Sequence, residues 1–140
     1  MVNIRPADSK DIEWLIRHDD HVDEGWIRRC IQSSEYLLAE QNATLIGFLR
    51  FSQFWGKIPY MEMIRVLPDY RRCGVGTALY RTWEAAMAAE EFGLLMTSSE
   101  RGETEPQDWH RRNGFREAGE IHFVTLQTSE VFFIKEISLG

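Results

Sequence analysis

Hydrophobic positions recur at two different spacings along this chain of 140 residues. Apolar residues spaced by three and four positions predict helices, and short apolar runs rich in β-branched and aromatic residues predict strands. The predicted helices cover residues 9–17, 25–33, 74–90 and 107–112. The predicted strands cover residues 2–5, 36–40, 45–53, 59–66, 94–98, 116–127 and 131–137. This order of elements predicts an α+β fold with a mixed sheet.

Local signals predict where several of these elements begin and end. Ser9 is the expected N-cap of the first helix, and Gly93 stands where the C′ glycine of the long helix is expected. The polar residues 41–44 predict a hairpin turn, and residues 128–130 predict the turn between the last two strands. The inner face of the long helix is expected to consist of Val75, Ala78, Leu79, Thr82, Trp83 and Ala86.

The composition, with 44% hydrophobic and 27% charged residues, predicts one globular domain spanning residues 1–140. No apolar run approaches the ~20 residues that a membrane helix needs, and the first residues carry no apolar signal segment. We therefore expect a cytoplasmic protein that does not bind membranes. Cys30 and Cys73 stand far apart, which argues against a disulfide scaffold or a zinc site. The formal net charge of -6 disfavours nucleic acid as a partner and suits a cationic one.

The stretch RRCGVGTALY, from Arg71 to Tyr80, places two arginines and two glycines directly before the long helix. A helix N-terminus presents backbone N–H groups without intrahelical partners and carries about half a positive charge. Gly74 and Gly76 let a bulky anion approach the backbone, and Arg71 and Arg72 add positive charge. These features predict an anion site that suits a diphosphate.

Two common nucleotide-binding loops do not fit this stretch. A Walker A loop needs Gly-Lys-Ser/Thr, whereas Gly76 is followed by Thr77 and Ala78. A Rossmann fingerprint needs a small residue where Leu79 stands and an acidic residue about 20 positions later. On this stretch alone, the alternative is an ordinary glycine-containing helix cap with exposed arginines.

The passage around this loop, together with two further motifs, resembles the GNAT superfamily of N-acetyltransferases over nearly the whole chain. Arg71, Gly74 and Gly76 match the acyl-CoA signature Arg/Gln-x-x-Gly-x-Gly/Ala. The other matches are Val66, Pro68 and Tyr70 before the loop, Ile4, Arg5, Ala7, Asp11 and Leu15 near the start, and Asn113, Gly114 and Phe115 after the short helix. The resemblance implies a GNAT-like mixed, mostly antiparallel sheet of about six or seven strands flanked by about four helices.

The same resemblance implies acetyl-CoA as the cosubstrate. The pantetheine arm is expected to pair with the strand edge around Ile64 to Val66. The pyrophosphate is expected to bind beside Arg71, at the backbone N–H groups of Arg72, Cys73, Gly74, Val75, Gly76 and Thr77.

Acetyl transfer to an amine needs a base, because an alkylammonium with a pKa near 10.4 is only about one part in two thousand neutral at pH 7. Glu62 is the leading candidate, since it stands two and four positions before Ile64 and Val66 and so is expected on their strand face. Many members of the superfamily that the chain resembles use a glutamate on this strand. The alternative is a glutamate that simply faces solvent.

His110 stands four residues before Gly114, where the family that the chain resembles commonly has a tyrosine acting as general acid to the thiolate. An imidazole can donate a proton to sulfur or relay one from the amine. The resemblance therefore makes His110 the second candidate catalytic residue. The alternative is a polar residue on a short amphipathic helix.

The expected acceptor is a primary amine on a small cationic molecule. In the fold that the resemblance implies, residues 18–24 border the acceptor pocket, and their histidine and carboxylate spacing matches no standard metal site. Phe51, Phe54 and Trp55 are expected to pack in the core or to line that pocket. The alternatives are acetylation of a protein N-terminus or lysine, and a noncatalytic acyl-CoA-binding module. The C-terminal strands could also pair two subunits into a homodimer.

Overall fold

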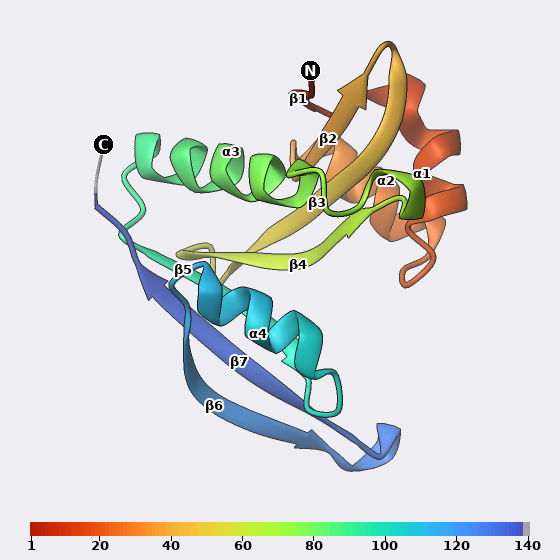
Figure 1. The fold of residues 1–140 in the computed structure, drawn as a ribbon. Helices are drawn as coiled ribbons and strands as arrows, with labels where there is room; N and C mark the ends of the chain where they lie inside the picture. The colour runs from red at the N-terminus through yellow and green to blue at the C-terminus, as the bar shows by residue number, and fades with distance from the viewer. Residues whose placement is uncertain (139–140) are drawn as a thin grey trace. The chain divides into compact units, whose positions relative to one another are not determined.

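The computed structural model describes residues 1–138, which form an α+β fold with a seven-stranded mixed sheet (Figure 1). The strands are β1 (Asn3–Pro6), β2 (Tyr36–Gln41), β3 (Thr44–Phe54), β4 (Ile58–Val66), β5 (Leu94–Glu100), β6 (Arg116–Phe123) and β7 (Thr128–Glu136). The α-helices are α1 (Ile12–His18), α2 (Glu24–Gln32), α3 (Val75–Ala89) and α4 (Thr104–Arg112). The strand order is β1-β2-β3-β4-β5-β7-β6, in which β4 and β5 run parallel and the pairs β1–β2, β2–β3, β5–β7 and β6–β7 are antiparallel. The predicted fold class and sheet type are confirmed.

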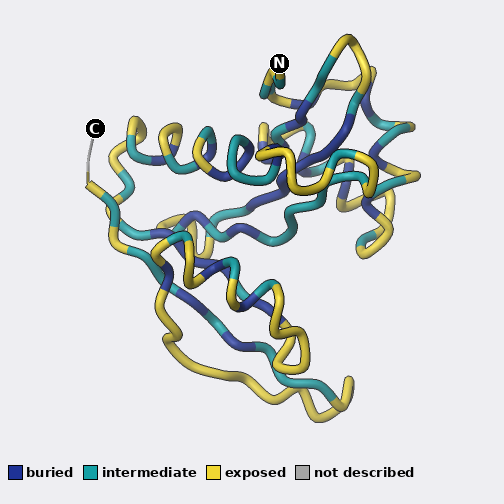
Figure 2. The backbone as a smooth tube through the Cα atoms, in the orientation of Figure 1, coloured by how far each residue is buried: buried dark blue, intermediate teal, exposed yellow. Residues whose placement is uncertain are grey.

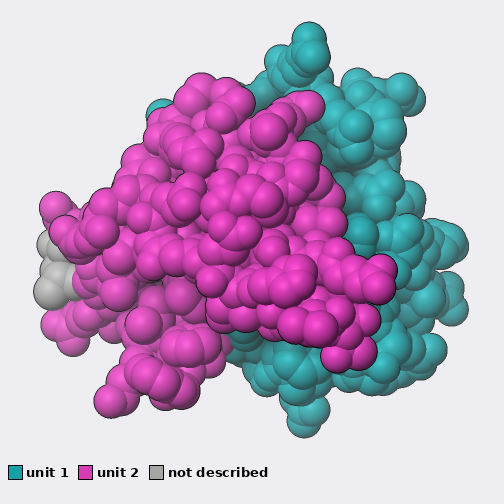
Figure 3. Space-filling model, turned by 90° about the horizontal axis from the view of Figure 1, so that it is seen from below, with its two compact units in different colours: residues 1–52, 63–85 teal, residues 53–62, 86–140 magenta. Residues whose placement is uncertain are grey.

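The chain divides into two compact units (Figure 3). Unit 1 comprises residues 1–52 and 63–85, and unit 2 comprises residues 53–62 and 86–140. Strand β4 contributes its first half to unit 2 and its second half to unit 1. That residues 1–140 form a single domain stays a prediction.

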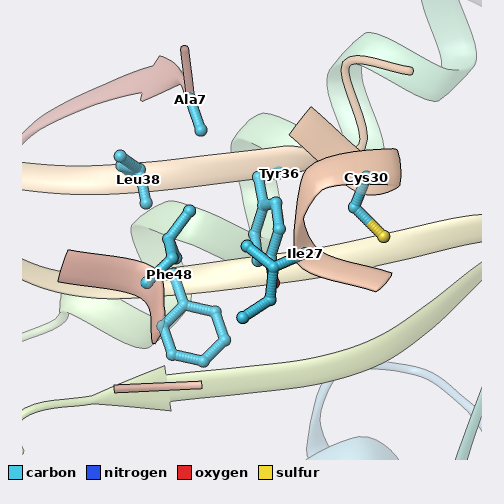
Figure 4. Packing of buried hydrophobic residues seen from close by; sticks show 7 residues of the cluster. Ala7, Ile27, Cys30, Tyr36, Leu38 and Phe48 are labelled. Atoms are coloured by element: carbon cyan, nitrogen blue, oxygen red, sulfur yellow. The ribbon is translucent and has the colours of Figure 1, made fainter. Parts of the chain in front are cut away.

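The core of unit 1 lies between helices α1 and α2 and the strands β2 and β3 (Figure 4). The amphipathic α2 buries Ile27 and Cys30, which pack with Tyr36 of β2 and Phe48 of β3. The Tyr36 and Phe48 rings meet edge to face with 6.0 Å between their centroids. Successive residues of a strand face opposite sides of the sheet. Because Phe48 faces this core, the neighbouring Gly47 faces the other side.

Helix α3 packs against this other face of unit 1. A Cβ atom added to Gly47 would lie only 2.8 Å from the backbone oxygen of Arg65 and 3.5 Å from a methyl group of Leu79 in α3. Nearby, Phe51 and Trp83 bring their rings to 6.0 Å. Glycine at position 47 therefore lets β3, the end of β4 and α3 approach one another closely.

Unit 2 is built on β5, β7 and β6, with α4 covering one face. The ring of His110 in α4 lies 5.4 Å from that of Phe133, and Lys135 donates from Nζ to the backbone oxygen of Asn113 at 2.8 Å. Burial alternates along β7, where Val131 and Phe133 are buried and their neighbours are half-buried, whereas β6 is exposed along its whole length (Figure 2). The covered face of the sheet is therefore the one that β7 shares with α4.

The first helical segment begins one residue earlier than predicted. Asp8, not Ser9, is the N-cap of a short 3-10 helix that precedes α1, and Asp8 accepts from the backbone N–H of Lys10 at 3.0 Å. Asp11 returns the interaction by accepting from the backbone N–H of Asp8 at 2.9 Å, which completes a capping box. Asp11 is itself held by Arg5. The cap is therefore the Asp8 carboxylate, paired reciprocally with Asp11, and not the Ser9 hydroxyl that we expected.

The end of α3 also differs from the prediction. Glu91, at φ 69, takes the left-handed conformation that we expected at Gly93, and Phe92 donates its N–H to the Met87 oxygen at 3.1 Å. This is the bond of a Schellman motif, which glycine favours but does not require. On the inner face of α3, Ala86 is exposed and Met87 is buried in its place.

Two turns connecting strands differ from the prediction. The last two strands are joined by a 3-10 turn at Val124–Leu126 followed by Gln127 at φ 54, so residues 128–130 belong to β7 and not to the turn. Between β3 and β4, Trp55 lies at a turn with φ 58 and is 80% exposed. It therefore does not pack in the core, unlike the buried Phe51.

Candidate functional site

The glycine loop predicted to bind a diphosphate lies in unit 1, directly before α3. Its backbone takes left-handed conformations at Arg72, with φ 63, and at Gly74, with φ 82. Gly74 then accepts the first helical hydrogen bond, from Ala78 at 3.0 Å. A Cβ added to Gly74 would meet no atom within 4 Å, so the side of the backbone that glycine leaves bare is open. The loop therefore exposes backbone at the start of a helix.

The loop and the first turn of α3 carry no acidic residue. Helices leave their first backbone N–H groups without intrahelical partners, and the aligned peptide dipoles add partial positive charge there. The Arg72 and Cys73 side chains are exposed beside these groups. This end of α3 can therefore hold an anion such as a diphosphate by its backbone.

Arg71 has a structural contact in the loop. Its Nε donates to the backbone oxygen of Val66 at 2.9 Å, which ties the loop to the last residue of β4. The next residue, Leu67, donates its N–H to Ile46 of β3 at 2.8 Å. These two hydrogen bonds hold the start of the loop against the ends of β3 and β4.

The predicted pantetheine edge, Ile64 to Val66, lies in the part of β4 that belongs to unit 1. Met63 packs against the core cluster beneath α1 and α2, and Arg65 donates from Nη1 to the backbone oxygen of His18 at 3.1 Å. Alternation along the strand then directs the half-buried Ile64 and Val66 to the opposite face. All of the predicted cofactor-binding residues therefore belong to unit 1, on two consecutive segments of the chain.

Glu62 is half-buried and lies in the part of β4 that belongs to unit 2. Its role as the base stays a prediction. His110 belongs to unit 2 as well.

His110 is a core residue of unit 2, with only 4% of its surface exposed. Its Nε2 lies 2.9 Å from Ser99 Oγ, and its ring lies 6.0 Å from that of Phe115. Burial lowers the pKa of His110 to about 4, so the imidazole is neutral at pH 7. A neutral imidazole can accept a proton or offer its N–H, but it carries no extra proton to give to a leaving thiolate. The catalytic role of His110 stays a prediction.

One group of polar side chains in unit 2 was not recognised as a unit from the sequence. Tyr60 of β4, Ser98 of β5 and Glu130 of β7 form a continuous chain of hydrogen bonds. The Tyr60 hydroxyl lies 2.5 Å from Ser98 Oγ, and Ser98 donates to Glu130 Oε2 at 2.6 Å. The available signal was the polar second half of β5, from Thr97 to Glu100, but which of its side chains meets Tyr60 and Glu130 depends on the register of three strands.

The acidic segment between α1 and α2 has structural partners. Asp19 is buried and accepts from Arg50 Nε at 2.7 Å and from the Tyr36 hydroxyl at 2.5 Å. Burial and the hydrogen bond to Asp19 raise the pKa of the Tyr36 phenol. Asp23 caps α2 by accepting from the N–H of Trp26 at 2.9 Å. The carboxylates of this segment thus anchor the chain as well as giving it negative charge.

Within residues 1–138, no group of three or more histidine, cysteine, aspartate or glutamate side chains is arranged to hold a metal ion. In the same part of the chain, no helix is both long and apolar enough to span a membrane.

Comparison with known proteins connects this arrangement with a family. The model of the acetyltransferase (GNAT) family matches residues 4–115. Among curated protein sequences, none is significantly similar to the chain.

Solved structures share the fold at low sequence identity. Ard1 from Thermoplasma volcanium superposes with a TM-score of 0.88 at 15% identity, covering 97% of each chain. The ribosomal-protein-S18-alanine N-acetyltransferase from Escherichia coli has a TM-score of 0.84 at 18% identity, covering 100% of this chain and 96% of that one. A Bacillus anthracis protein assigned as a streptothricin acetyltransferase, in complex with acetyl coenzyme A, has a TM-score of 0.81 at 14% identity and covers 99% of each chain.

Proposed function

The chain belongs to the GNAT family of acetyltransferases, and from that premise we propose that it transfers an acetyl group from acetyl-CoA to a primary amine on a small cationic molecule. Membership in the family makes the protein an acyltransferase. Acetyl-CoA as the donor is supported by a structural neighbour that contains it.

The glycine loop is the observation that carries the donor assignment. It combines a left-handed glycine with an open face at position 74, a helix start without acidic residues, and the exposed Arg72. Each of these features stabilises a bound pyrophosphate, and together they match the acyl-CoA signature of the family. Arg71 also ties the loop to Val66 at the end of β4. The proposed pyrophosphate site therefore directly follows the proposed pantetheine edge along the chain.

The charge of the protein supports a cationic acceptor. The formal net charge is -6, and the sequence pI is about 5.2. Negative charge attracts an ammonium ion and raises its local concentration. The same cation must lose a proton before its nitrogen can attack the thioester, so the site needs a base.

The proposed reaction places three demands on the protein. A base takes the proton of the ammonium, and Glu62 is the candidate for it. A backbone N–H near Val66 stabilises the negative charge that develops on the thioester oxygen. As the C–N bond forms and the C–S bond breaks, the thiolate leaves with a pKa near 8.5, so its protonation is less demanding than that of an alkoxide.

An acetyl-CoA consumption assay with a panel of amines tests the proposal. The panel contains small polyamines, other small cationic amines, neutral amines, and peptides with a free N-terminus or a lysine. We expect free thiol to accumulate fastest with a small cationic amine, and mass spectrometry of the product should show one added acetyl group.

The outcomes separate the alternatives. Faster turnover of the peptides would transfer the assignment to protein acetylation. Binding of acetyl-CoA without thiol release in the presence of any amine would identify a noncatalytic acyl-CoA-binding module.

A further inference from the structure

Tyr60, Ser98 and Glu130 connect three strands of unit 2 through two short hydrogen bonds. The oxygen atoms of Tyr60 and Ser98 lie 2.5 Å apart, and those of Ser98 and Glu130 lie 2.6 Å apart. The Tyr60 ring also stacks on Phe132, with 6.3 Å between the centroids. Both contacts hold the phenol in one orientation.

The carboxylate at one end fixes the direction of every hydrogen bond in this chain. An ionised glutamate can only accept, so Ser98 donates its single hydroxyl hydrogen to Glu130. Ser98 then has only lone pairs to offer Tyr60, so the Tyr60 hydroxyl donates to Ser98. Toward any further hydrogen-bonding group, the Tyr60 oxygen therefore acts as an acceptor. An ammonium or amine N–H is the kind of donor that suits it.

The three residues share one face of the sheet in unit 2. In the strand register, Tyr60 stands opposite Met96, Ser98 stands opposite Phe132, and Glu130 stands opposite Glu100. Helix α4 covers the other face, where His110 meets Ser99. Tyr60, Ser98 and Glu130 are half-buried, so a ligand can reach the chain from solvent while most of each side chain is shielded.

The position of Tyr60 along β4 connects the chain with the proposed reaction. Tyr60 stands two residues before Glu62, a distance of about 7 Å along a strand. An amine placed to react near Glu62 is thus within a side-chain length of the Tyr60 hydroxyl.

We infer that Tyr60, Ser98 and Glu130 form a proton relay that, in place of Glu62, accepts the proton of the acceptor ammonium, an inference that rests on the proposed function. The ammonium gives its proton to Tyr60 Oη while the phenolic proton moves to Ser98 Oγ and the serine proton moves to Glu130. The charges balance, because an ammonium and a carboxylate become a neutral amine and a neutral carboxyl group. Glu130 afterwards returns the proton to solvent. Tyr60 is the catalytic residue of the relay, and Ser98 and Glu130 act through it.

A comparison of acceptors with different basicity tests this relay. The variants are Tyr60→Phe, Ser98→Ala and Glu130→Gln, and each is assayed with the best alkylamine of the panel and with methoxyamine, a weakly basic amine that is neutral at pH 7. We expect kcat/KM for the alkylamine to fall about 100-fold in each variant, as for the loss of a general base. With methoxyamine, kcat/KM should stay within about threefold of the wild-type value, because no proton must be removed before attack.

Matched variants control for the loss of a hydroxyl or a carboxylate alone. Ser129→Ala and Glu136→Gln change neighbouring positions on β7 outside the relay, where the side chains bond to the exposed His122 and Arg116. Both should keep wild-type kcat/KM with both acceptors. Ser98→Thr, which keeps the hydroxyl, should recover most of the activity that Ser98→Ala loses.

The pH dependence gives a second readout. In the relay variants, kcat/KM for the alkylamine should rise about tenfold per pH unit toward the pKa of the amine, because only the free base then reacts. Equal losses with both acceptors, or wild-type rates in Tyr60→Phe, would overturn the relay while leaving the acetyltransferase assignment intact. No turnover by the wild-type protein with any amine would overturn the proposed function and the relay with it.

Discussion

At the scale of single residues, His110 shows how burial decides what a side chain can do. Its imidazole is packed among Ser99, Phe115 and Phe133, and only 4% of the residue is exposed. A protonated imidazole would lose its hydration there, which explains why the pKa falls to about 4. The fold therefore keeps His110 neutral over the range in which an ordinary histidine titrates.

This lowered pKa makes a prediction about stability. The unfolded chain takes up a proton at His110 below about pH 6.5, whereas the folded protein does not until the pH approaches 4. Its contribution to the free energy of unfolding is therefore constant above pH 6.5 and decreases as the pH falls toward 4, by at most about 3 kcal/mol. We expect His110→Asn to be less stable than the wild type at pH 7.5, with a gap that narrows at pH 4.5. Urea unfolding at both pH values measures the gap.

Thr97→Ser provides the control, because the buried Thr97 side chain has no group that titrates in this range. Thr97→Ser should change the free energy of unfolding by the same amount at pH 7.5 and 4.5. A gap for His110→Asn that is equal at the two pH values would contradict the burial argument.

The catalytic prediction for His110 needs a separate measurement. If His110 handles the thiolate or relays the amine proton, His110→Ala lowers kcat by about 10²- to 10⁴-fold. The KM for acetyl-CoA should change little, and His110→Tyr should recover part of the rate. Steady-state kinetics on variants that keep a cooperative melting transition decide the matter. An alanine variant with most of the wild-type kcat would leave His110 as a packing residue.

Gly74 carries the prediction for the donor site. Its φ of 82 disfavours any side chain, so Gly74→Glu should cost about 1 kcal/mol of stability and place a carboxylate against the pyrophosphate. We expect the Kd for CoA to rise at least about 100-fold, measured by calorimetry. Gly102→Glu is the control, because Gly102 also has open space around it and lies outside the loop. Unchanged affinity in Gly74→Glu would mean that the pyrophosphate binds elsewhere.

The candidate residues differ in how far the sequence could predict them. The loop from Arg71 to Thr77 was predictable because its chemistry depends on consecutive residues before a helix. The relay of Tyr60, Ser98 and Glu130 was not, because it depends on the pairing register of β4, β5 and β7. Local patterns do not encode that register between strands far apart in the chain.

At the scale of elements, a buried ionic group anchors the end of α1 to the sheet of unit 1. Asp19 ends α1, and it is bound by Arg50 of β3 and by Tyr36 of β2. The carboxylate and the guanidinium are both almost fully buried, so each compensates the buried charge of the other. Removing one partner leaves an uncompensated buried charge, which costs much more than the loss of an exposed pair.

We predict that Arg50→Met destabilises the protein by about 3 to 5 kcal/mol in urea unfolding. The double variant Asp19→Asn with Arg50→Met should be more stable than the sum of the single changes indicates, since it leaves no lone charge. Arg116→Met provides the control, because Arg116 pairs with Glu136 on the surface and should change stability by less than about 1 kcal/mol. Additive effects in the double variant would argue against a coupled ion pair.

The same scale shows where local patterns sufficed and where they failed. The three-four spacing predicted α1, α2 and α3 to within a few residues, because one face of each is buried. The turn before β7 was misplaced, since Val124, Thr125 and Leu126 are typical strand residues that form a 3-10 turn here. A left-handed Gln127 closes that turn, and glutamine gives no warning of such a conformation.

At the scale of the whole molecule, ligand binding is the most direct test of the donor assignment. A ligand that binds only the folded state at 100 times its Kd stabilises it by about 2.7 kcal/mol, which is on the order of 10 °C in Tm for a protein of this size. We predict this shift with CoA or acetyl-CoA and little shift with ATP or NAD. Thermal unfolding followed by circular dichroism measures it. A shift with ATP and none with CoA would contradict the assignment.

The two cysteines differ in a way that has a practical consequence. Cys30 is buried in the core of unit 1, whereas Cys73 is exposed between Arg72 and Gly74. A maleimide dye added to the folded wild-type protein therefore attaches beside the proposed pyrophosphate site without any engineered handle. If CoA binds at this loop as proposed, it should shield the sulfur, and the rate of dye attachment then measures how much of the protein carries bound CoA.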